Sequence, residues 1–281
     1  MTNFITTQLT NGFGNNIFQY AAARLLGEYH KLPVYARAPT PDYYGIPDLK
    51  NLGVQFIDDA PQSTGDTHQV NENNFIKTFD KSYSRHNIRL SGYFEDYRYY
   101  FNNLETIKSW FPAVATRDDN ALVLHMRTGD RLFMKNEFHS KPRVENYLNA
   151  IKKFDFEELH IVTDMPKWST VTEDELQSMK FHVNTPQSER VPIEESVRYF
   201  NELVEGLAGY NPQITQRSVG EDFEFIRSFK NILFEHGTLS WWAAALSNAE
   251  KVGVYGPWRS WKGPQNKNLS KIPLNNWFRW E

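Results

Sequence analysis

The chain has 281 residues, 40% of them hydrophobic, which fits one large or two ordinary globular domains. It contains no cysteine, which excludes disulfides, thiolate metal sites and cysteine nucleophiles. The net charge is −3 and no apolar window is long enough to cross a membrane, so we expect no nucleic-acid partner and no membrane anchor.

The first part of the chain reads as an α/β unit. Residues 4–9 alternate apolar and polar side chains and predict a strand, a glycine turn follows, and residues 17–30 have the apolar spacing of an amphipathic helix. Further strands are predicted over 32–37 and 88–94, a helix over 96–111, and mostly irregular structure over 40–80.

The second part repeats the alternation after a connection at residues 112–120. The predicted strands are 121–126, 158–164, 231–235 and 251–257, and the predicted helices are 140–154, 221–231 and 238–249. Strands that alternate with helices indicate parallel sheets covered on both faces. We therefore predict an α/β fold of two domains, residues 1–115 and 116–281, with a cleft between them.

Polar residues follow four of these strands: Asn15, Arg127, Asp164 and Thr238. Ligands of open parallel sheets bind beyond the carboxyl ends of the strands. Four such positions together predict one nucleotide-sized site.

The glycine turn before the first helix invites comparison with a dinucleotide fingerprint. That pattern fails, because Ile17 stands where the third glycine belongs and the next strand ends without an acid for a ribose. The remaining interpretations are a plain tight turn, or a turn in which Gly14 and Asn15 bring backbone amides and a side chain to a ligand.

Arg127 follows a buried strand, where an unpaired guanidinium costs several kcal/mol. It pairs either with Asp130 or with a ligand phosphate, which its planar fork suits. His125, two residues earlier, is either a structural histidine or a base.

The other strand ends also allow two interpretations each. Asp164 either accepts hydrogen bonds from a guanine edge or caps a helix that begins at Pro166. Gly237, Thr238 and Ser240 either form a phosphate site at a helix N-terminus or reflect capping by Thr238 alone. Trp241 and Trp242, inside that helix, are predicted core residues.

Several reaction classes lack their motifs. The sequence contains no Walker A loop, no H-E-x-x-H, no G-x-S-x-G and no D-x-D. The missing D-x-D disfavours sugar transfer through a metal-bound diphosphate. A metal-free enzyme neutralises a leaving diphosphate with arginine and helix N-terminal amides, which are the groups found here.

Five segments in the same order resemble the α1,2-fucosyltransferases of glycosyltransferase family 11 and the wider superfamily of α1,6- and protein O-fucosyltransferases. They are GFGNNIFQYAAARLL, SGYFEDYRYY, LHMRTGDRL, IVTDMPKW and HGTLSWWAAALSNAEKVGVYGPWR. The resemblance spans residues 10–260 and thins over 40–80 and 185–220.

The resemblance implies a GT-B fold of two Rossmann-like domains, the first on the acceptor side and the second binding the donor. It implies inverting, metal-independent transfer from a GDP-sugar, GDP-fucose first, to a glycan hydroxyl, with no cofactor. By matching positions, Arg127 contacts the diphosphate, Asp164 reads guanine, and Asn15 lies near the reaction centre. The donor site is completed by Gly14, His125, Gly237, Thr238 and Ser240.

Three positions depart from the resembled motifs: Thr128 replaces a second arginine, Asn16 a glutamine and Gly237 a serine. They leave open another GDP-sugar, of the rhamnose or mannose type, or a glycan- or nucleotide-binding module without turnover. Candidates for a general base are Glu137, Asp130 and His139, with Glu137 preferred. The absence of an anchor and of cysteines favours a cytoplasmic bacterial or viral setting.

Overall fold

The computed structural model describes two units of the chain, Met1–Ala113 and Val114–Glu281. The described residues are 3–10, 12–38, 45–57, 66–128, 142–165, 193–235, 237–256 and 275–280. Each unit contains one parallel sheet, as the alternation of strands and helices predicted.

The first unit is built on a four-stranded sheet in the order β2-β1-β4-β3, and every pair of neighbours is parallel. Its strands are β1 (Ile5–Gln8), β2 (Val34–Arg37), β3 (Thr67–Val70) and β4 (Asn87–Leu90). Helix α1 (Phe13–His30) packs on the sheet through Ala22 and Leu26, both fully buried. The helix follows β1 directly, so its N-terminus lies at the carboxyl edge of the sheet.

The rest of the first unit consists of short helical segments. They are α2 (Ile46–Asn51), η2 (Ile76–Thr78), η3 (Lys81–Arg85), η4 (Tyr97–Tyr99), η5 (Phe101–Asn103) and α3 (Leu104–Lys108). Phe75 and Phe94 from the connecting segments fill the core against Ile88 and Leu90.

The second unit contains a six-stranded sheet in the order β10-β9-β8-β5-β6-β7, again parallel throughout. Its strands are β5 (Ala121–Met126), β6 (Glu158–Thr163), β7 (Gln213–Thr215), β8 (Asn231–Phe234), β9 (Lys251–Tyr255) and β10 (Trp277–Trp280). All six residues of β5 are buried, as expected for a central strand covered on both faces.

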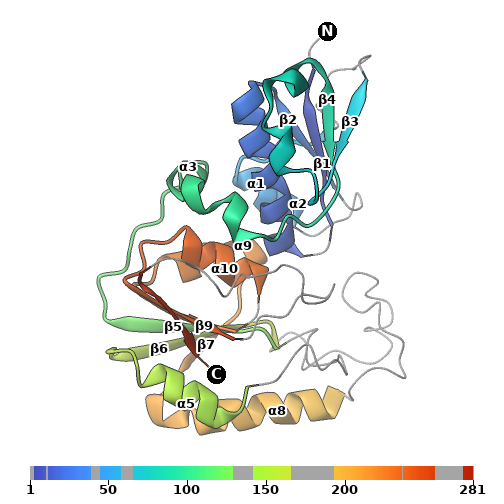
Figure 1. The fold of residues 1–281 in the computed structure, drawn as a ribbon. Helices are drawn as coiled ribbons and strands as arrows, with labels where there is room; N and C mark the ends of the chain where they lie inside the picture. The colour runs from blue at the N-terminus through green and yellow to red at the C-terminus, as the bar shows by residue number, and fades with distance from the viewer. Residues whose placement is uncertain are drawn as a thin grey trace. The chain divides into compact units, whose positions relative to one another are not determined.

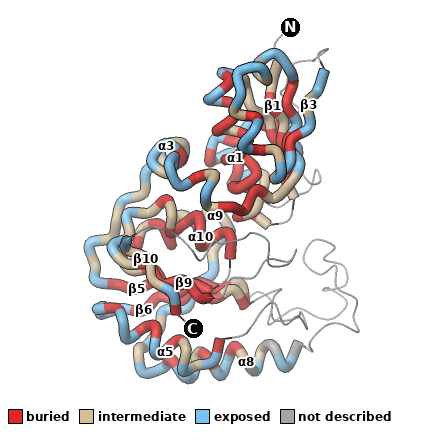
Figure 2. The backbone as a smooth tube through the Cα atoms, in the orientation of Figure 1, coloured by how far each residue is buried: buried red, intermediate tan, exposed pale blue. Residues whose placement is uncertain are grey.

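Helices cover both faces of this sheet (Figure 1). Helices α5 (Val144–Ile151) and α8 (Ile193–Gly206) lie on one face, and α9 (Val219–Arg227) and α10 (Thr238–Ala245) on the other. A short turn, η7 (Ala208–Tyr210), follows α8. Figure 2 shows burial concentrated in the strands and in α10, where Trp241 and Trp242 are core residues, as predicted.

The predicted strands are all present, but several other elements differ. Residues 40–80, predicted to be mostly irregular, contain the short elements α2, β3 and η2, which were not predicted individually. Strand β3 gave no alternating pattern because it lies at a sheet edge and buries only Val70. Helix α8 and the edge strands β7 and β10 were not predicted.

Two helices begin or end differently from the prediction. The helix expected over 96–111 is divided into η4, η5 and α3, because Asp96 accepts a hydrogen bond from the backbone of Arg98 and competes with helical bonding. Helix α1 begins at Phe13 rather than residue 17. Gly14 and Asn15 therefore belong to its first turn.

Candidate functional site

The carboxyl edge of the second sheet has the topology of a nucleotide site. If β5 is numbered 1 and the strands are counted along the chain to β10, the order across the sheet from β7 is 3-2-1-4-5-6. This is the strand order of the Rossmann fold. The connections change faces between β5 and β8, since α5 follows β5 on one face and α10 follows β8 on the other. In such sheets a ligand binds in the crevice at this switch point.

A buried hydrogen bond joins the two sides of the switch point. Ser240 Oγ on α10 lies 2.5 Å from His125 Nδ1 on β5, and both side chains are buried. Burial, helped by the positive charge of Arg127, lowers the pKa of His125 to about 3, so the imidazole is neutral at pH 7. His125 thus holds the start of α10 against the end of β5.

The N-cap position of α10 carries no side-chain cap among the described residues. Its N-cap is Gly237, so capping by Thr238, one of the two interpretations of the sequence, is wrong. The first turn carries no acidic residue, so its backbone amides and helix dipole form an electropositive end beside Arg127. A Cβ on Gly237 would lie 3.1 Å from Ser240 Oγ, a tight contact, so a side chain at this position would require Ser240 to move by a few tenths of an ångström.

Thr128, the departure from the second arginine, is part of the sheet edge. It is only 1% exposed, and its hydroxyl lies 2.7 Å from that of Thr163 at the end of β6. Thr163 Oγ1 in turn accepts the backbone N–H of Met165 at 3.2 Å. The Thr128 side chain therefore connects the ends of β5 and β6. An arginine here would have to place the aliphatic part of its side chain in that buried position.

Two carboxylates lie at the β6–β7 end of the same edge. Asp164 follows β6, and Asp222 lies in the first turn of α9, which follows β7. The side chain of Asp222 is 14% exposed, and its Oδ1 is buried without a hydrogen bond from any described residue. Burial raises the pKa of Asp222 to about 6; Arg217 opposes the rise and the charge of Asp164 adds to it.

Arg217 completes this group. Its Nη1 lies 3.6 Å from Asp222 Oδ1 and donates to Thr215 Oγ1 at 2.9 Å. Its guanidinium carbon lies 3.7 Å from the ring centroid of Phe225, a close cation–π contact. The arginine is thereby held beside the carboxylate.

Glu235 is a third buried acid at the edge, directly after β8. It is 6% exposed and accepts a hydrogen bond from the hydroxyl of Tyr147 on α5. Burial first, and then the nearby charge of Glu235, raise the pKa of Tyr147 well above its usual range. The contact ties α5 to the end of β8.

The predicted residues divide into three groups. The switch point brings together His125, Arg127, Gly237, Thr238 and Ser240, and Asp164 ends the neighbouring strand. Gly14 and Asn15 lie in the first turn of α1 in the other unit, where α1 also has no side-chain cap and no acid. Asp130, Glu137 and His139 lie outside the described residues.

Asp222 and Glu235 were not predicted from the sequence. Glu235 is the last residue of a predicted strand, as Asp164 is, and met the same criterion as the selected residues. Asp222 follows a capping box, Ser218 with Glu221, which marks a helix start. Its link to Asp164 depends on the β6–β7 pairing, and β7 was not predicted.

Among the described residues, no group of three or more acidic or histidine side chains is arranged to hold a metal ion. In the same part of the chain, no helix has the length and apolar character needed to cross a bilayer. Metal independence stays a prediction.

No protein-family model matches the chain, and no curated protein matches it. Among solved structures, a mutant of FUT1 from Arabidopsis thaliana in complex with GDP aligns with 92% of this chain and 71% of its own at 10% identity and TM-score 0.46. The fucosyltransferase NodZ from Bradyrhizobium aligns with 90% and 94% at 11% identity and TM-score 0.42.

The iron-containing dodecameric glycosyltransferase TibC from enterotoxigenic E. coli aligns with 92% of this chain and 63% of its own at 12% identity and TM-score 0.42. At these low similarities, the function has to be argued from the site itself.

The role of Thr128 gives a stability prediction. Thr128→Val keeps the shape and removes the hydroxyl contact with Thr163, so the free energy of unfolding should fall by about 1 kcal/mol. Thr128→Arg should cost more, because it buries a charge. Denaturant unfolding measures both, with the exposed Thr106→Val hydroxyl loss as a surface comparison. Equal stability of Thr128→Arg and wild type would contradict the buried role.

Proposed function

We propose that the chain is an inverting, metal-independent glycosyltransferase that moves a sugar, first of all L-fucose, from a GDP-sugar to a hydroxyl of a glycan acceptor. The observation that carries the proposal is the distribution of charge along the carboxyl edge of the second sheet. Arg127 and the uncapped α10 N-terminus flank the switch point, and Asp164 and Asp222 lie toward the other end.

The spacing of these groups supports a nucleoside diphosphate. Strands β8, β5, β6 and β7 are consecutive in the sheet, and neighbouring strands lie about 4.8 Å apart. The cationic groups and the acids are therefore separated by one to three strand spacings, roughly 5–15 Å. An extended nucleoside diphosphate has its phosphates and the far edge of its base at a comparable separation.

The acids favour guanine among the bases. Guanine presents N1–H and N2–H donors side by side on one edge, and a carboxylate accepts two parallel hydrogen bonds. Uracil offers one donor on the matching edge. Asp164 and Asp222 supply carboxylates at this end of the sheet.

The second unit would thus bind the donor, and the first unit the acceptor. The acceptor oxygen attacks the anomeric carbon opposite the diphosphate; the bond from that carbon to the phosphate oxygen breaks, and the electron pair leaves with GDP. Arg127 and the α10 amides stabilise that charge. The hydroxyl proton passes to a base, for which we assign Glu137, with Asp130 and His139 as alternatives. Asn15 lies at the acceptor side of the reaction centre.

The function is tested by measuring GDP release from GDP-fucose, GDP-mannose and GDP-rhamnose, with galactose, lactose or N-acetyllactosamine as acceptor and with water alone, with and without EDTA. The proposal is supported if an acceptor sugar accelerates GDP release from GDP-fucose and EDTA does not change that rate. Preference for another GDP-sugar would reassign the donor, and GDP binding without release would indicate a binding module.

Arg127 should carry much of the leaving-group stabilisation. Arg127→Gln is expected to lower kcat by about 10²–10³, the usual cost of losing one electrostatic stabiliser. The control is Arg198→Gln, whose side chain is 71% exposed on α8 and should keep wild-type turnover. Turnover of the Arg127 variant within threefold of wild type would contradict the assignment.

Substitution of Asp222 should have opposite effects on GDP binding and on the stability of the fold. Its folded pKa of about 6 exceeds the unfolded value of 3.8, so its contribution to stability is present below pH 4 and is lost as the pH rises through 6. At pH 7 the buried charge is unfavourable. Asp222→Asn should therefore keep or raise the free energy of unfolding.

The same substitution should weaken GDP binding by about tenfold or more, because a carboxylate acceptor is lost. Wild-type affinity should fall as the pH drops below 6, where Asp222 takes up a proton. Calorimetric titration measures both, with the exposed Asp155→Asn as control. If Asp222→Asn binds GDP like wild type, the carboxylate does not read the base.

The general base is tested by Glu137→Gln, which should lower kcat at saturating substrates by about 10²-fold or more. GDP affinity should not change. Full turnover would exclude Glu137, and the same assay on Asp130→Asn and His139→Gln then tests the alternatives.

A further inference from the structure

In the first unit, one buried side chain connects the carboxyl ends of two neighbouring strands. Gln19, in α1, is 1% exposed. Its Nε2 donates to Thr10 Oγ1 at 2.7 Å, just after β1, and to the carbonyl of Gly92 at 3.0 Å, just after β4. Strands β1 and β4 are neighbours in the sheet although about 80 residues separate them in the sequence.

The acceptor oxygen of the same amide is also used. Gln19 Oε1 accepts the backbone N–H of Thr10 at 2.9 Å and Asn16 Nδ2 at 3.3 Å. A primary amide has two donors and two acceptor lone pairs, so the capacity of Gln19 is filled. The segment after β1, the first turn of α1 and the segment after β4 are thereby held to one another.

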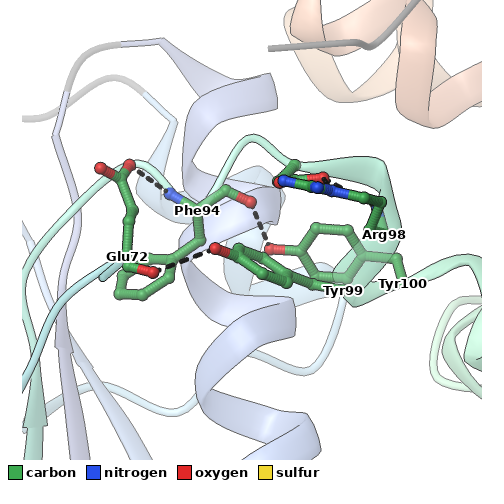
Figure 3. A network of polar contacts seen from close by, with 6 residues as sticks. Glu72, Phe94, Arg98, Tyr99 and Tyr100 are labelled. Carbon is green, nitrogen blue, oxygen red and sulfur yellow. Dashed lines mark hydrogen bonds and ion pairs between the residues drawn. The ribbon is translucent and has the colours of Figure 1, made fainter. Parts of the chain in front are cut away.

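The segment after β4 has an unfavourable backbone. Phe94 has φ 54°, in the left-handed region, and this costs a non-glycine residue about 1–2 kcal/mol. Figure 3 shows how it is held: the Glu72 carboxylate accepts the Phe94 N–H at 3.0 Å, and Tyr100 donates to the Phe94 carbonyl at 2.7 Å. Glu72 also accepts the N–H of Tyr93 at 2.9 Å.

Backbone strain that several contacts maintain is found mainly at ligand-binding and catalytic sites. Here the strained segment begins at Gly92, the residue that Gln19 holds, at the edge where ligands of parallel sheets bind. Gln19 also fixes the helix turn that presents Asn15, through Asn16.

We propose that Gln19 is a positioning residue for the acceptor: its amide sets the first turn of α1 and the Gly92–Phe94 segment in the arrangement that receives the acceptor sugar. This inference rests on the proposed function. It differs from a purely structural role, in which loss of Gln19 would affect activity only through stability.

The first unit offers a matched control. Asn87 begins β4 at the amino edge of the same sheet, is 4% exposed, and accepts the backbone N–H of Phe4 at 3.1 Å. It is also a buried amide that connects the β1 and β4 strands, at the opposite edge. Gln19→Glu and Asn87→Asp make the same chemical change at the two edges.

The experiment measures GDP release from GDP-fucose with N-acetyllactosamine, lactose or galactose and with water alone, below the melting temperature of each variant, together with the Kd for GDP. For Gln19→Glu we expect sugar-dependent release to fall on the order of 10- to 100-fold, as for a small misplacement of a reactant, while water-dependent release and GDP affinity stay within about threefold of wild type. Asn87→Asp should keep the wild-type ratio of transfer to hydrolysis.

An unchanged ratio in Gln19→Glu, or an equal fall of the ratio in Asn87→Asp, would overturn the inference. If Gln19→Glu does not fold, Thr10→Val removes only the hydroxyl that Nε2 contacts, and the ratio should fall about three- to tenfold. If none of these sugars accelerates GDP release by the wild type, the proposed function itself fails and the role of Gln19 with it.

Discussion

The hydrogen bond between His125 and Ser240 is the contact on which the candidate donor site depends. It joins the end of β5, a central strand, to the first turn of α10, the helix that follows the neighbouring strand β8. The two residues are 115 positions apart in the sequence. Because the imidazole is neutral, it holds α10 without adding charge near Arg127. The helix amides and the guanidinium are thus fixed on the two sides of one switch point.

The parallel sheet then distributes the remaining groups. Every strand of the second unit ends at the same edge, so the polar residues that follow the strands form a row in sheet order. Arg127 and the α10 N-terminus lie near β5 and β8, where the buried Glu235 carboxylate accepts a hydrogen bond from Tyr147, and Asp164 and Asp222 lie near β6 and β7. Asp222 is buried at a cost in stability at neutral pH, which is common where side chains are arranged for a ligand rather than for folding.

The sequence predicted most of this edge. Buried strands such as 121–126 are short apolar runs, and the residues that follow them are read directly from the chain. The amphipathic period also located α1, and an apolar run located α10. Arg127, Asp164 and Thr238 were identified because they are local to a strand end.

Non-local features were not predictable in this way. The role of Thr128 depends on Thr163 in the neighbouring strand, and the proximity of Asp222 to Asp164 depends on an edge strand of three residues. The amide contacts of Gln19 join segments that only the β1–β4 pairing brings together. A glutamine in an apolar helix has no sequence pattern that reveals such partners.

The central claim is that the edge of the second sheet binds a guanine nucleotide. The most direct measurement is thermal unfolding of the wild-type protein with GDP, UDP, CMP or NADH, each with and without EDTA. The account predicts that GDP alone raises the melting temperature by several degrees at saturating concentration, and that EDTA does not change the shift. Stronger stabilisation by UDP, or loss of the GDP effect with EDTA, would contradict it.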